Sequence, residues 1–288
     1  MQDICSVEFV LRFIYVKSAI FMDRFSSSVE ICENPWLKKS DPMTQPTSYR
    51  SSPRRCGIII PVYNSSRHLG ELLHGIAAVQ TSLSGWELPV LIIDDGSNPP
   101  LPPQRYAGQQ VTQQRHEQNR GKGAALKQGF AYFLQDPQVQ AVLTLDGDMQ
   151  HPPQFIPQFL EAYEAGRGEV IVGRRHRDYR VMPLHRILSN WLTSRIISRM
   201  TGQHIPDSQC GFRLISRAAL AQVDVRENRF HLESEFLIRC GWKKIPVGFV
   251  AIPTIYNGAP SAIRHLPDTL NFVAVVFKLS LERIKGHV

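Results

Sequence analysis

Apolar and polar positions alternate in blocks along most of the chain. Four short apolar runs rich in branched residues are typical of strands buried on both faces of a parallel sheet: residues 57–60, 90–93, 139–145 and 170–172. Helix-length segments lie between these runs, at about residues 66–82, 121–135 and 153–165. Strand followed by helix, repeated, predicts an α/β fold with a doubly wound, mostly parallel sheet flanked by helices.

The first part of the chain has a different composition. Residues 41–53 are rich in Ser, Pro and Thr, which favours an unstructured segment over a packed one. We therefore expect residues 1–53 to form a poorly structured N-terminal extension, with Met22 and Met43 as alternative translation starts. Residues 54–288 are expected to form a single domain that ends in an amphipathic helix.

Neither membrane spans nor disulfides are favoured. A spanning helix needs roughly 20 clean apolar residues. The two best stretches, Val7 to Met22 and Leu270 to Leu281, are interrupted by charged or polar side chains. The five cysteines include no CxxC pair, which is typical of free thiols in a reducing compartment. We expect a cytoplasmic protein, with contact at the inner face of the membrane left open.

Composition and charge narrow the classes of function. The 288 residues are 43% hydrophobic and 20% charged, which excludes disorder as the main state. The formal charge of +8 is uneven: residues 56–172 carry seven basic and eleven acidic side chains, whereas residues 173–217 carry nine arginines and two aspartates. The arginines suit a phosphate-bearing ligand, and equally a solvated helix face. The net negative charge of residues 56–172 argues against binding of nucleic acid, which needs a broad basic face.

Polar clusters follow three of the predicted strands: Pro61-Val62-Tyr63-Asn64, Asp94-Asp95-Gly96-Ser97 and Asp146-Gly147-Asp148-Met149-Gln150. In a doubly wound sheet, ligands bind at the carboxyl ends of the strands, so these clusters should share one crevice. Adjacent carboxylates need a cation or other donors as partners. Asp146 and Asp148, one glycine apart, suit Mg²⁺ or Mn²⁺, which takes one or two carboxylates and completes its shell with water and substrate phosphates.

Another motif opens the predicted helix 121–135. Asn119-Arg120-Gly121-Lys122-Gly123-Ala124 contains two glycines and a lysine but matches neither GxxxxGK[ST] nor GxGxxG. The glycines allow close packing at a helix start. Lys122 is either solvated or directed toward an anionic ligand, and we favour the ligand.

In this order and spacing, the four motifs resemble those of the family 2 glycosyltransferases, specifically the dolichyl-phosphate mannosyltransferase and glucosyltransferase-like branch, over about residues 56–268. The resemblance implies a GT-A single domain that transfers a hexose, with inversion, from a UDP- or GDP-linked sugar to a polyprenyl phosphate. It implies metal ligands at Asp146, Asp148 and Gln150, for Mg²⁺ or Mn²⁺. It also implies donor contacts from Pro61, Tyr63, Asn64, Asp94, Asp95 and Asp146, and from Arg264 in a late loop. Lys122, favoured above from its place at the helix start, completes the expected donor contacts.

The resemblance also implies that the arginine-rich segment, residues 173–217, binds the acceptor. The matching positions for the acceptor phosphate are Arg175 and Arg186, and the segment from Asp207 to Arg213 resembles one that lines the acceptor and sugar pocket. With Asp148, these arginines and Asp207 are the candidate catalytic residues. Two arginines suit a phosphate monoester, which is already a nucleophile at neutral pH and needs no general base.

A hydroxyl acceptor on a lipid, glycan or other small molecule is the alternative, and it requires a carboxylate base. Asp207, Glu233 and Glu235 are the candidates, although the two glutamates equally fit an exposed helix start. A helix predicted to begin near Pro183 carries an apolar stripe that we expect to pack in the core: Leu184, Ile187, Leu188, Trp191, Leu192, Ile196 and Met200.

Two positions depart from the family pattern. Ser65 stands where relatives often have an acidic residue after Pro-x-Tyr-Asn, which leaves the nucleoside contacts open. Gly173-Arg174-Arg175 replaces Gly-Ser-Arg, and the extra arginine bears on the choice of donor or acceptor. The intact set of Asp146, Asp148 and Gln150 favours an enzyme over an inactive nucleotide-sugar-binding scaffold.

Overall fold

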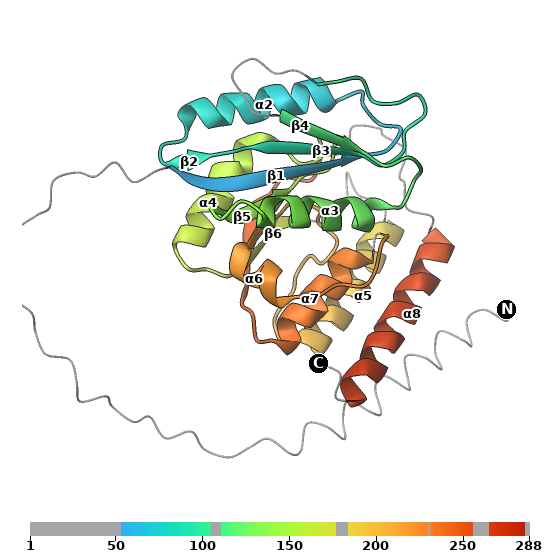
Figure 1. The fold of residues 1–288 in the computed structure, drawn as a ribbon. Helices are drawn as coiled ribbons and strands as arrows, with labels where there is room; N and C mark the ends of the chain where they lie inside the picture. The colour runs from blue at the N-terminus through green and yellow to red at the C-terminus, as the bar shows by residue number, and fades with distance from the viewer. Residues whose placement is uncertain (1–52, 105–110, 177–183, 230, 256–264, 286–288) are drawn as a thin grey trace, which may run out of the picture. The chain divides into compact units, whose positions relative to one another are not determined.

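A mostly parallel sheet forms the centre of residues 51–288 in this computed structural model, which describes residues 53–104, 111–176, 184–229, 231–255 and 265–285 (Figure 1). Within the described residues the sheet has eight strands: β1 (Arg54–Val62), β2 (Trp86–Glu87), β3 (Val90–Asp94), β4 (Val111–Arg115), β5 (Val139–Thr144), β6 (Val170–Arg175), β7 (Arg213–Ser216) and β8 (Val247–Ile252). Their order is β4-β3-β1-β5-β7-β6-β8, with β2 beside β1. β7 runs antiparallel to β5 and β6, and the other pairings are parallel.

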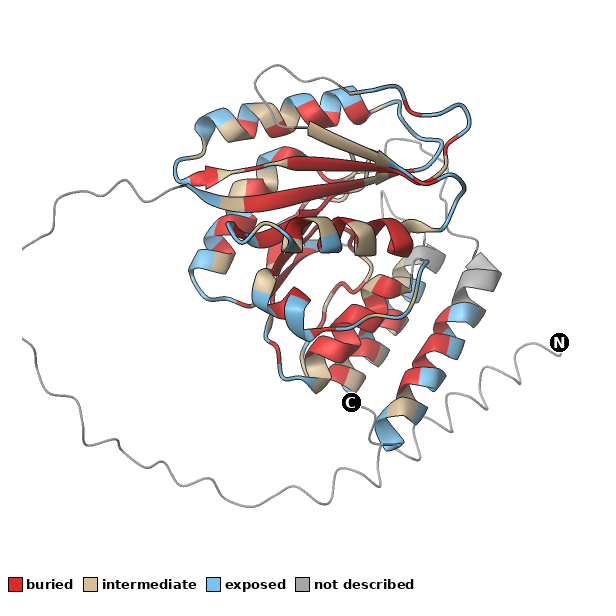
Figure 2. Cartoon of the chain, in the orientation of Figure 1, coloured by how far each residue is buried: buried red, intermediate tan, exposed pale blue. Residues whose placement is uncertain are grey.

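The central strands are apolar because both of their faces are covered. Every residue of β3 is buried, and the isoleucines of β1 have no exposed surface. Figure 2 shows this buried layer between helices. The four predicted apolar runs lie in β1, β3, β5 and β6, so the predicted α/β class is confirmed.

Helices flank the sheet as the strand–helix alternation predicts: α2 (Leu69–Ser82), α3 (Lys122–Leu134), the 3₁₀ turn η2 (Pro153–Phe155), α4 (Ile156–Glu164) and α6 (Arg217–Gln222). The bounds of α2, α3 and the η2–α4 segment fall within three residues of the predicted segments, whereas α6 was not predicted. α3 packs closely on β1, where the Phe133 ring lies 2.6 Å from the point that a Cβ on Gly57 would occupy. A larger residue at position 57 would therefore displace the helix.

Three more helices complete the described chain: α5 (Leu184–Thr201), α7 (Leu232–Trp242) and α8 (His265–Ile284). The expectation that the apolar stripe of α5 packs in the core is wrong for Leu188 and Trp191, which are 63% and 44% exposed. The buried side of α5 carries the hydroxyls of Thr193 and Ser194 beside the apolar Ile197. Ser194 Oγ accepts the Ser208 amide at 3.0 Å and Thr193 Oγ1 accepts the Gln209 side chain at 3.1 Å, so hydrogen bonds to residues 208–209 fix the rotation of the helix.

The ends of the chain bear on several expectations. The expected N-terminal extension lies outside the described residues except for Pro53. α8 occupies the region where the sequence predicts a C-terminal helix. In the part of the chain that is described, no helix combines the length and the hydropathy needed to cross a membrane. Cys56, Cys210 and Cys240 are buried free thiols, as expected.

Candidate active site

The predicted polar clusters meet at one edge of the sheet because β1 lies between β3 and β5 and all three run parallel. The Asp95 amide donates to the Val62 carbonyl at 2.8 Å, and the Asn64 amide donates to Ser97 Oγ at 2.9 Å. A Cβ on Gly147 would lie 3.8 Å from the carbonyl oxygen of Pro61. The three clusters therefore form one continuous surface at the carboxyl ends of these strands.

Asp94 and Asp95 are buried, and their carboxylates bind the protein itself. Asp94 accepts the amides of Ser97 at 2.8 Å and Leu101 at 3.1 Å, and also the Arg115 guanidinium. Burial raises the pKa of Asp94, but these hydrogen bonds outweigh burial and hold the pKa below its usual value. Asp94 thus fixes the shape of the loop that follows β3.

Asp95 joins that loop to the start of α3. Its carboxylate accepts the amides of Arg120 at 2.9 Å and Gly121 at 2.8 Å and lies 2.6 Å from His116 Nδ1. A carboxylate on the exposed amides at a helix N-terminus is favoured by the helix dipole. Any contact of Asp94 or Asp95 with a nucleoside remains a prediction. Of the other predicted donor contacts, Pro61 is half-buried and Tyr63 is 50% exposed.

Asn64 shapes the loop that follows β1. Its backbone has φ of 49°, and its side-chain oxygen accepts the Asn98 amide at 2.8 Å. Asn tolerates this left-handed conformation better than most residues. The side chain therefore ties the loop after β1 to the loop after β3.

Lys122, the first residue of α3, lies between two carboxylates. Its Nζ is 2.7 Å from Asp146 Oδ1 and 3.2 Å from Glu233 Oε1, the latter without hydrogen-bond alignment. Burial alone would lower the pKa of Lys122, but the charges of Asp146 and Glu233 outweigh it and raise the pKa. Lys122 therefore stays charged, and its ion pairs with Asp146 and Glu233 link the predicted metal-binding loop to the start of α7.

Asp146 and Asp148 differ in their electrostatics. The Lys122 charge outweighs burial and lowers the pKa of Asp146 to about 2. Burial, and then the charge of Asp146, raise the pKa of Asp148. A divalent cation would relieve this repulsion, so the residues fit the predicted metal.

The donor set beside these aspartates is incomplete in protein atoms. Gln150 is half-buried, and its backbone N–H donates to Asp148 Oδ1 at 3.0 Å. The described residues contain no group of three His, Cys, Asp or Glu side chains placed to hold a metal ion. A cation held by Asp146 and Asp148 would thus take further oxygens from Gln150, water or a substrate, as Mg²⁺ and Mn²⁺ commonly do.

His151 follows this loop and was not singled out by the sequence. It is buried, and its Nδ1 lies 3.7 Å from Asp146 Oδ2 but has no hydrogen-bond partner among the described residues, whereas its Nε2 lies 3.6 Å from Cys210 Sγ. Burial lowers its pKa to about 4, so the ring is neutral at pH 7. The sequence could have indicated a place for His151 in the site, because the residue lies within the motif from Asp146 to Pro153.

Gly211 crosses directly over the Asp146–Lys122 pair. A Cβ at this position would lie 2.5 Å from Asp146 Oδ2 and 3.0 Å from Lys122 Nζ. The segment is held in place because the Gly211 carbonyl accepts Thr144 Oγ1 at 2.6 Å. Only glycine fits without moving the carboxylate.

If the sugar transfer that the resemblance implies takes place at this site, Gly211→Ala is expected to lower it at least about tenfold by displacing Asp146. Initial rates of sugar transfer at saturating donor measure the effect. Gly70→Ala is the matched control, since a Cβ there meets nothing within 4 Å. Equal rates for the two variants would contradict the prediction.

Arg175 and Asp207 form a bidentate ion pair at the end of β6. Arg175 Nε and Nη2 donate to the two carboxylate oxygens at 2.8 and 2.9 Å. Burial raises the pKa of Asp207, but the charge and hydrogen bonds of Arg175 outweigh it and lower the pKa. Of the other predicted contacts, Arg186 lies on α5 with its side chain outside the described residues, and Arg264 lies wholly outside them.

The two glutamates of α7 are not the exposed helix start that the sequence equally allowed. Glu235 is 1% exposed, accepts the amides of Arg226 and Glu227, and pairs with Arg239 at 2.7 Å. Glu233 contacts Lys122, a partnership that the sequence did not indicate. The two carboxylates hold the start of α7 in place.

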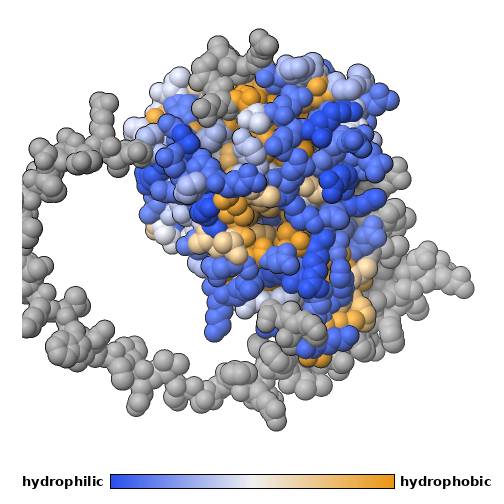
Figure 3. Space-filling view, viewed as in Figure 1, coloured by the Kyte–Doolittle hydropathy of each residue, from blue (hydrophilic) through white to orange (hydrophobic). Residues whose placement is uncertain are grey.

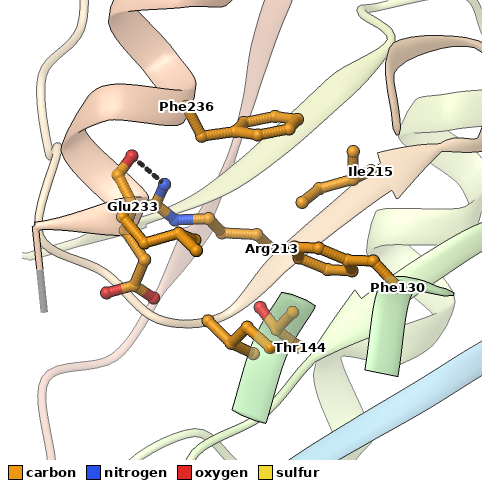
Figure 4. A pocket seen from close by; sticks show the side chains of 8 residues that line it. Phe130, Thr144, Arg213, Ile215, Glu233 and Phe236 are labelled. Carbon is orange, nitrogen blue, oxygen red and sulfur yellow. Dashed lines mark hydrogen bonds between the residues drawn. The ribbon is translucent and has the colours of Figure 1, made fainter. Parts of the chain in front are cut away.

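Arg213 is a further residue that sequence reasoning missed. It is 2% exposed and donates to the carbonyls of Ser208, Cys210 and Glu233, each at 2.8 Å. Figure 4 shows its side chain between Phe130 and Phe236, with the guanidinium directed to the Glu233 carbonyl. Arg213 thus joins the Asp207–Gly211 segment to α7.

Comparisons with known proteins agree with this arrangement. A family model described as glycosyl transferase family 2 matches residues 57–224, more than half of the chain. An uncharacterized protein of Methanocaldococcus jannaschii is 26% identical over 235 residues, covering 79% of this chain and 91% of that protein. The UDP-N-acetylglucosamine–dolichyl-phosphate N-acetylglucosaminyltransferase of Methanococcus voltae is 33% identical over 150 residues, covering 50% of this chain and 59% of that enzyme.

A solved structure supports the fold. Glucosyl-3-phosphoglycerate synthase from Mycobacterium tuberculosis, in complex with Mn²⁺, UDP and glucosyl-3-phosphoglycerate, has a TM-score of 0.55 at 18% identity, covering 80% of each chain. At this identity the likeness concerns the fold alone, which is the expected GT-A arrangement. The chain therefore belongs to glycosyl transferase family 2 and is a glycosyltransferase with a GT-A fold.

Proposed function

We propose that this glycosyltransferase moves a hexose from a UDP- or GDP-linked sugar to a polyprenyl phosphate, as in the dolichyl-phosphate mannosyltransferase and glucosyltransferase-like branch. The name of the Methanococcus voltae relative includes both a nucleotide sugar and a dolichyl phosphate, which supports this substrate pair. Inversion at the anomeric carbon belongs to the proposal. It requires the acceptor oxygen to attack from the face opposite the leaving diphosphate.

The observation that carries the choice of acceptor is that each candidate general base is engaged by a cation. Asp207 is held by both nitrogens of Arg175, Glu235 by Arg239, and Glu233 lies beside Lys122. A base needs a carboxylate that is open to the acceptor proton. A phosphate acceptor is already ionised at neutral pH and needs none.

Asp146 and Asp148, with Gln150, would hold Mg²⁺ or Mn²⁺ in this proposal. The bound cation would neutralise charge on the donor diphosphate and so stabilise the leaving nucleotide. Lys122 adds a permanent positive charge beside the same carboxylate, and Asp94 and Asp95 keep the surrounding loops in shape. Donor contacts from Pro61, Tyr63, Asn64 and Arg264 complete the proposed donor site.

Arg175 is proposed to receive the acceptor phosphate together with Arg186. The Asp207 carboxylate holds the Arg175 guanidinium by Nε and Nη2, which fixes the orientation of the group. An oriented guanidinium loses less entropy when it binds a phosphate. Asp207 is therefore proposed to position Arg175 rather than to act as a base.

The test compares two acceptors that differ in one group. A short-chain polyprenyl phosphate and the matching polyprenol are offered with labelled UDP- and GDP-sugars and Mn²⁺. We expect labelled product from the phosphate alone, and none when a chelator replaces Mn²⁺. Product from the polyprenol would instead favour transfer to a hydroxyl, and absence of product from every pair would contradict the substrate classes.

A further inference from the structure

α8 presents apolar side chains on two sides. Its inner side packs on the protein and is buried: Phe272, Val275, Val276 and Leu279. An outer row is 37–74% exposed and consists of Val273, Phe277, Leu281 and Ile284. Figure 2 shows buried and exposed residues alternating along α8, and Figure 3 shows apolar side chains over the lower part of this helix. An apolar row of this extent on the surface of a helix is a mark of an interaction surface.

The spacing of the outer row makes it one continuous surface. Its members are four, four and three residues apart, which places them on a single helical face. Phe277 and Ile284 are 57% and 74% exposed, so the row is open over at least two turns. The face therefore offers a strip of apolar surface and not a scattered set of side chains.

Exposed cations gather where the outer row ends. This basic end cluster consists of Arg199, Lys243, Lys244, Arg283 and Lys285. It forms because the C-terminal ends of α5, α7 and α8 meet. Arg283 Nη1 donates to the Met200 carbonyl at 3.2 Å, and a Cβ on Gly241 would lie 2.4 Å from Thr201 Cα.

Acidic side chains nearby are already paired. Glu282 is the one acid among the described side chains of α8, and it bonds Arg226 at 3.1 Å and Arg239 at 2.9 Å. Glu227 lies 3.3 Å from Lys278. Helix dipoles favour a cation at each C-terminus, but they do not account for the apolar row beside the cluster.

We propose that the outer row and the basic end cluster form a docking surface for an anionic lipid bilayer. Apolar side chains on one helix face enter the boundary between headgroups and acyl chains, and adjacent cations attract anionic headgroups. The biological use of this surface rests on the proposed function, because docking would bring the active site to a membrane-held polyprenyl phosphate. A second copy of the chain would bury the row, but among the described side chains of α8 it would offer the cations only Glu282, which is already paired.

The test is vesicle flotation of the full chain without donor or acceptor. Vesicles of phosphatidylcholine alone are compared with vesicles in which about one third of the lipid is phosphatidylglycerol, and salt is varied. We expect binding to the anionic vesicles that falls as salt rises. Phe277→Gln with Leu281→Gln should weaken this binding about tenfold, since it removes apolar surface. Lys243→Gln with Lys244→Gln should weaken it and reduce its dependence on salt.

Asn271→Gln, an exposed polar position of α8, is the matched control and should bind as the unaltered chain does. The substituted side chains are exposed, so thermal unfolding should be unchanged in all variants. The proposal is overturned if the full chain does not float with anionic vesicles. It is also overturned if sedimentation without lipid shows a dimer that the Phe277 and Leu281 changes dissociate.

Transfer to a water-soluble, short-chain polyprenyl phosphate separates this proposal from the proposed function. The row variants should keep that activity, because the acceptor does not need to be drawn from a bilayer. Flotation without transfer contradicts the proposed function alone. Transfer without flotation contradicts the docking surface alone.

Discussion

Asp148→Asn is expected to lower sugar transfer at least about a hundredfold while the protein still folds. The side chain lies in the loop after β5, beside Asp146, where a cation would bridge to the donor diphosphate. Asparagine keeps the shape of the side chain but removes the charge that the cation needs. Initial rates with Mn²⁺, and Mn²⁺-dependent nucleotide binding measured by calorimetry, should both be lost.

The stability of the same variant separates a site residue from a structural one. Burial and Asp146 raise the pKa of Asp148, so the folded state favours its protonated form. Such a group contributes stability at low pH and loses that contribution as pH rises through its folded pKa. At pH 7 a neutral asparagine should therefore unfold at the same temperature as the unaltered chain or a higher one.

Asp224→Asn is the matched control, because it changes an exposed aspartate outside the site. It should leave both transfer and nucleotide binding unchanged. Near-normal turnover of Asp148→Asn would remove Asp148 from the catalytic residues. Loss of transfer with full metal-dependent nucleotide binding would leave it a role in chemistry but not in holding the metal.

How far the sequence predicts the fold depends on burial. The strands covered on both faces, β1, β3, β5 and β6, are continuous apolar runs and were predictable. The edge strand β4 has the sequence Val-Thr-Gln-Gln-Arg and no buried residue, so it lacked that signal. α5 was predicted, but its rotation was not, because hydroxyls as well as the apolar Ile197 lie on its buried side.

How far the sequence predicts the candidate site depends on distance along the chain. Local motifs bring Asp94, Asp95, Asp146 and Asp148 to the strand ends, as expected from parallel strands. Pairing across long separations has no periodic signal, so the contact of Lys122 with Glu233 could not be predicted. The same holds for the bonds from Arg213 to backbone carbonyls, because any carbonyl of the chain can accept them.

Lys122→Met is expected to lower the free energy of unfolding by about 2 to 4 kcal/mol. Removing one member of a buried ion pair leaves its partner charge without compensation, and here both Asp146 and Glu233 lose their shared cation. The loss should fall short of the largest values for such pairs because the Asp146 side chain keeps 29% of its surface exposed. Urea unfolding measures it, with Lys127→Met on the same helix as the control.

Glu233→Gln in the same chain tests whether the glutamate is the source of the loss. In the double variant one uncompensated carboxylate is gone, so part of the lost stability should return. Purely additive effects of the two changes would show that Lys122 and Glu233 do not interact. That outcome would leave Asp146 as the single electrostatic partner of Lys122.

Added Mn²⁺ should restore stability to Lys122→Met more than to the unaltered chain. Asp146 is a predicted metal ligand, and its Oδ1 lies 2.7 Å from Lys122 Nζ, so the ammonium and the metal are expected to compete for this oxygen. Without the ammonium, Asp146 and Asp148 gain most from a divalent cation, and a ligand that binds the folded state raises the unfolding temperature. An equal rise in both proteins would mean that the ammonium and Mn²⁺ do not share this oxygen. A larger rise in the unfolding temperature of the variant would show that Lys122 neutralises the Asp146 charge when no metal is bound.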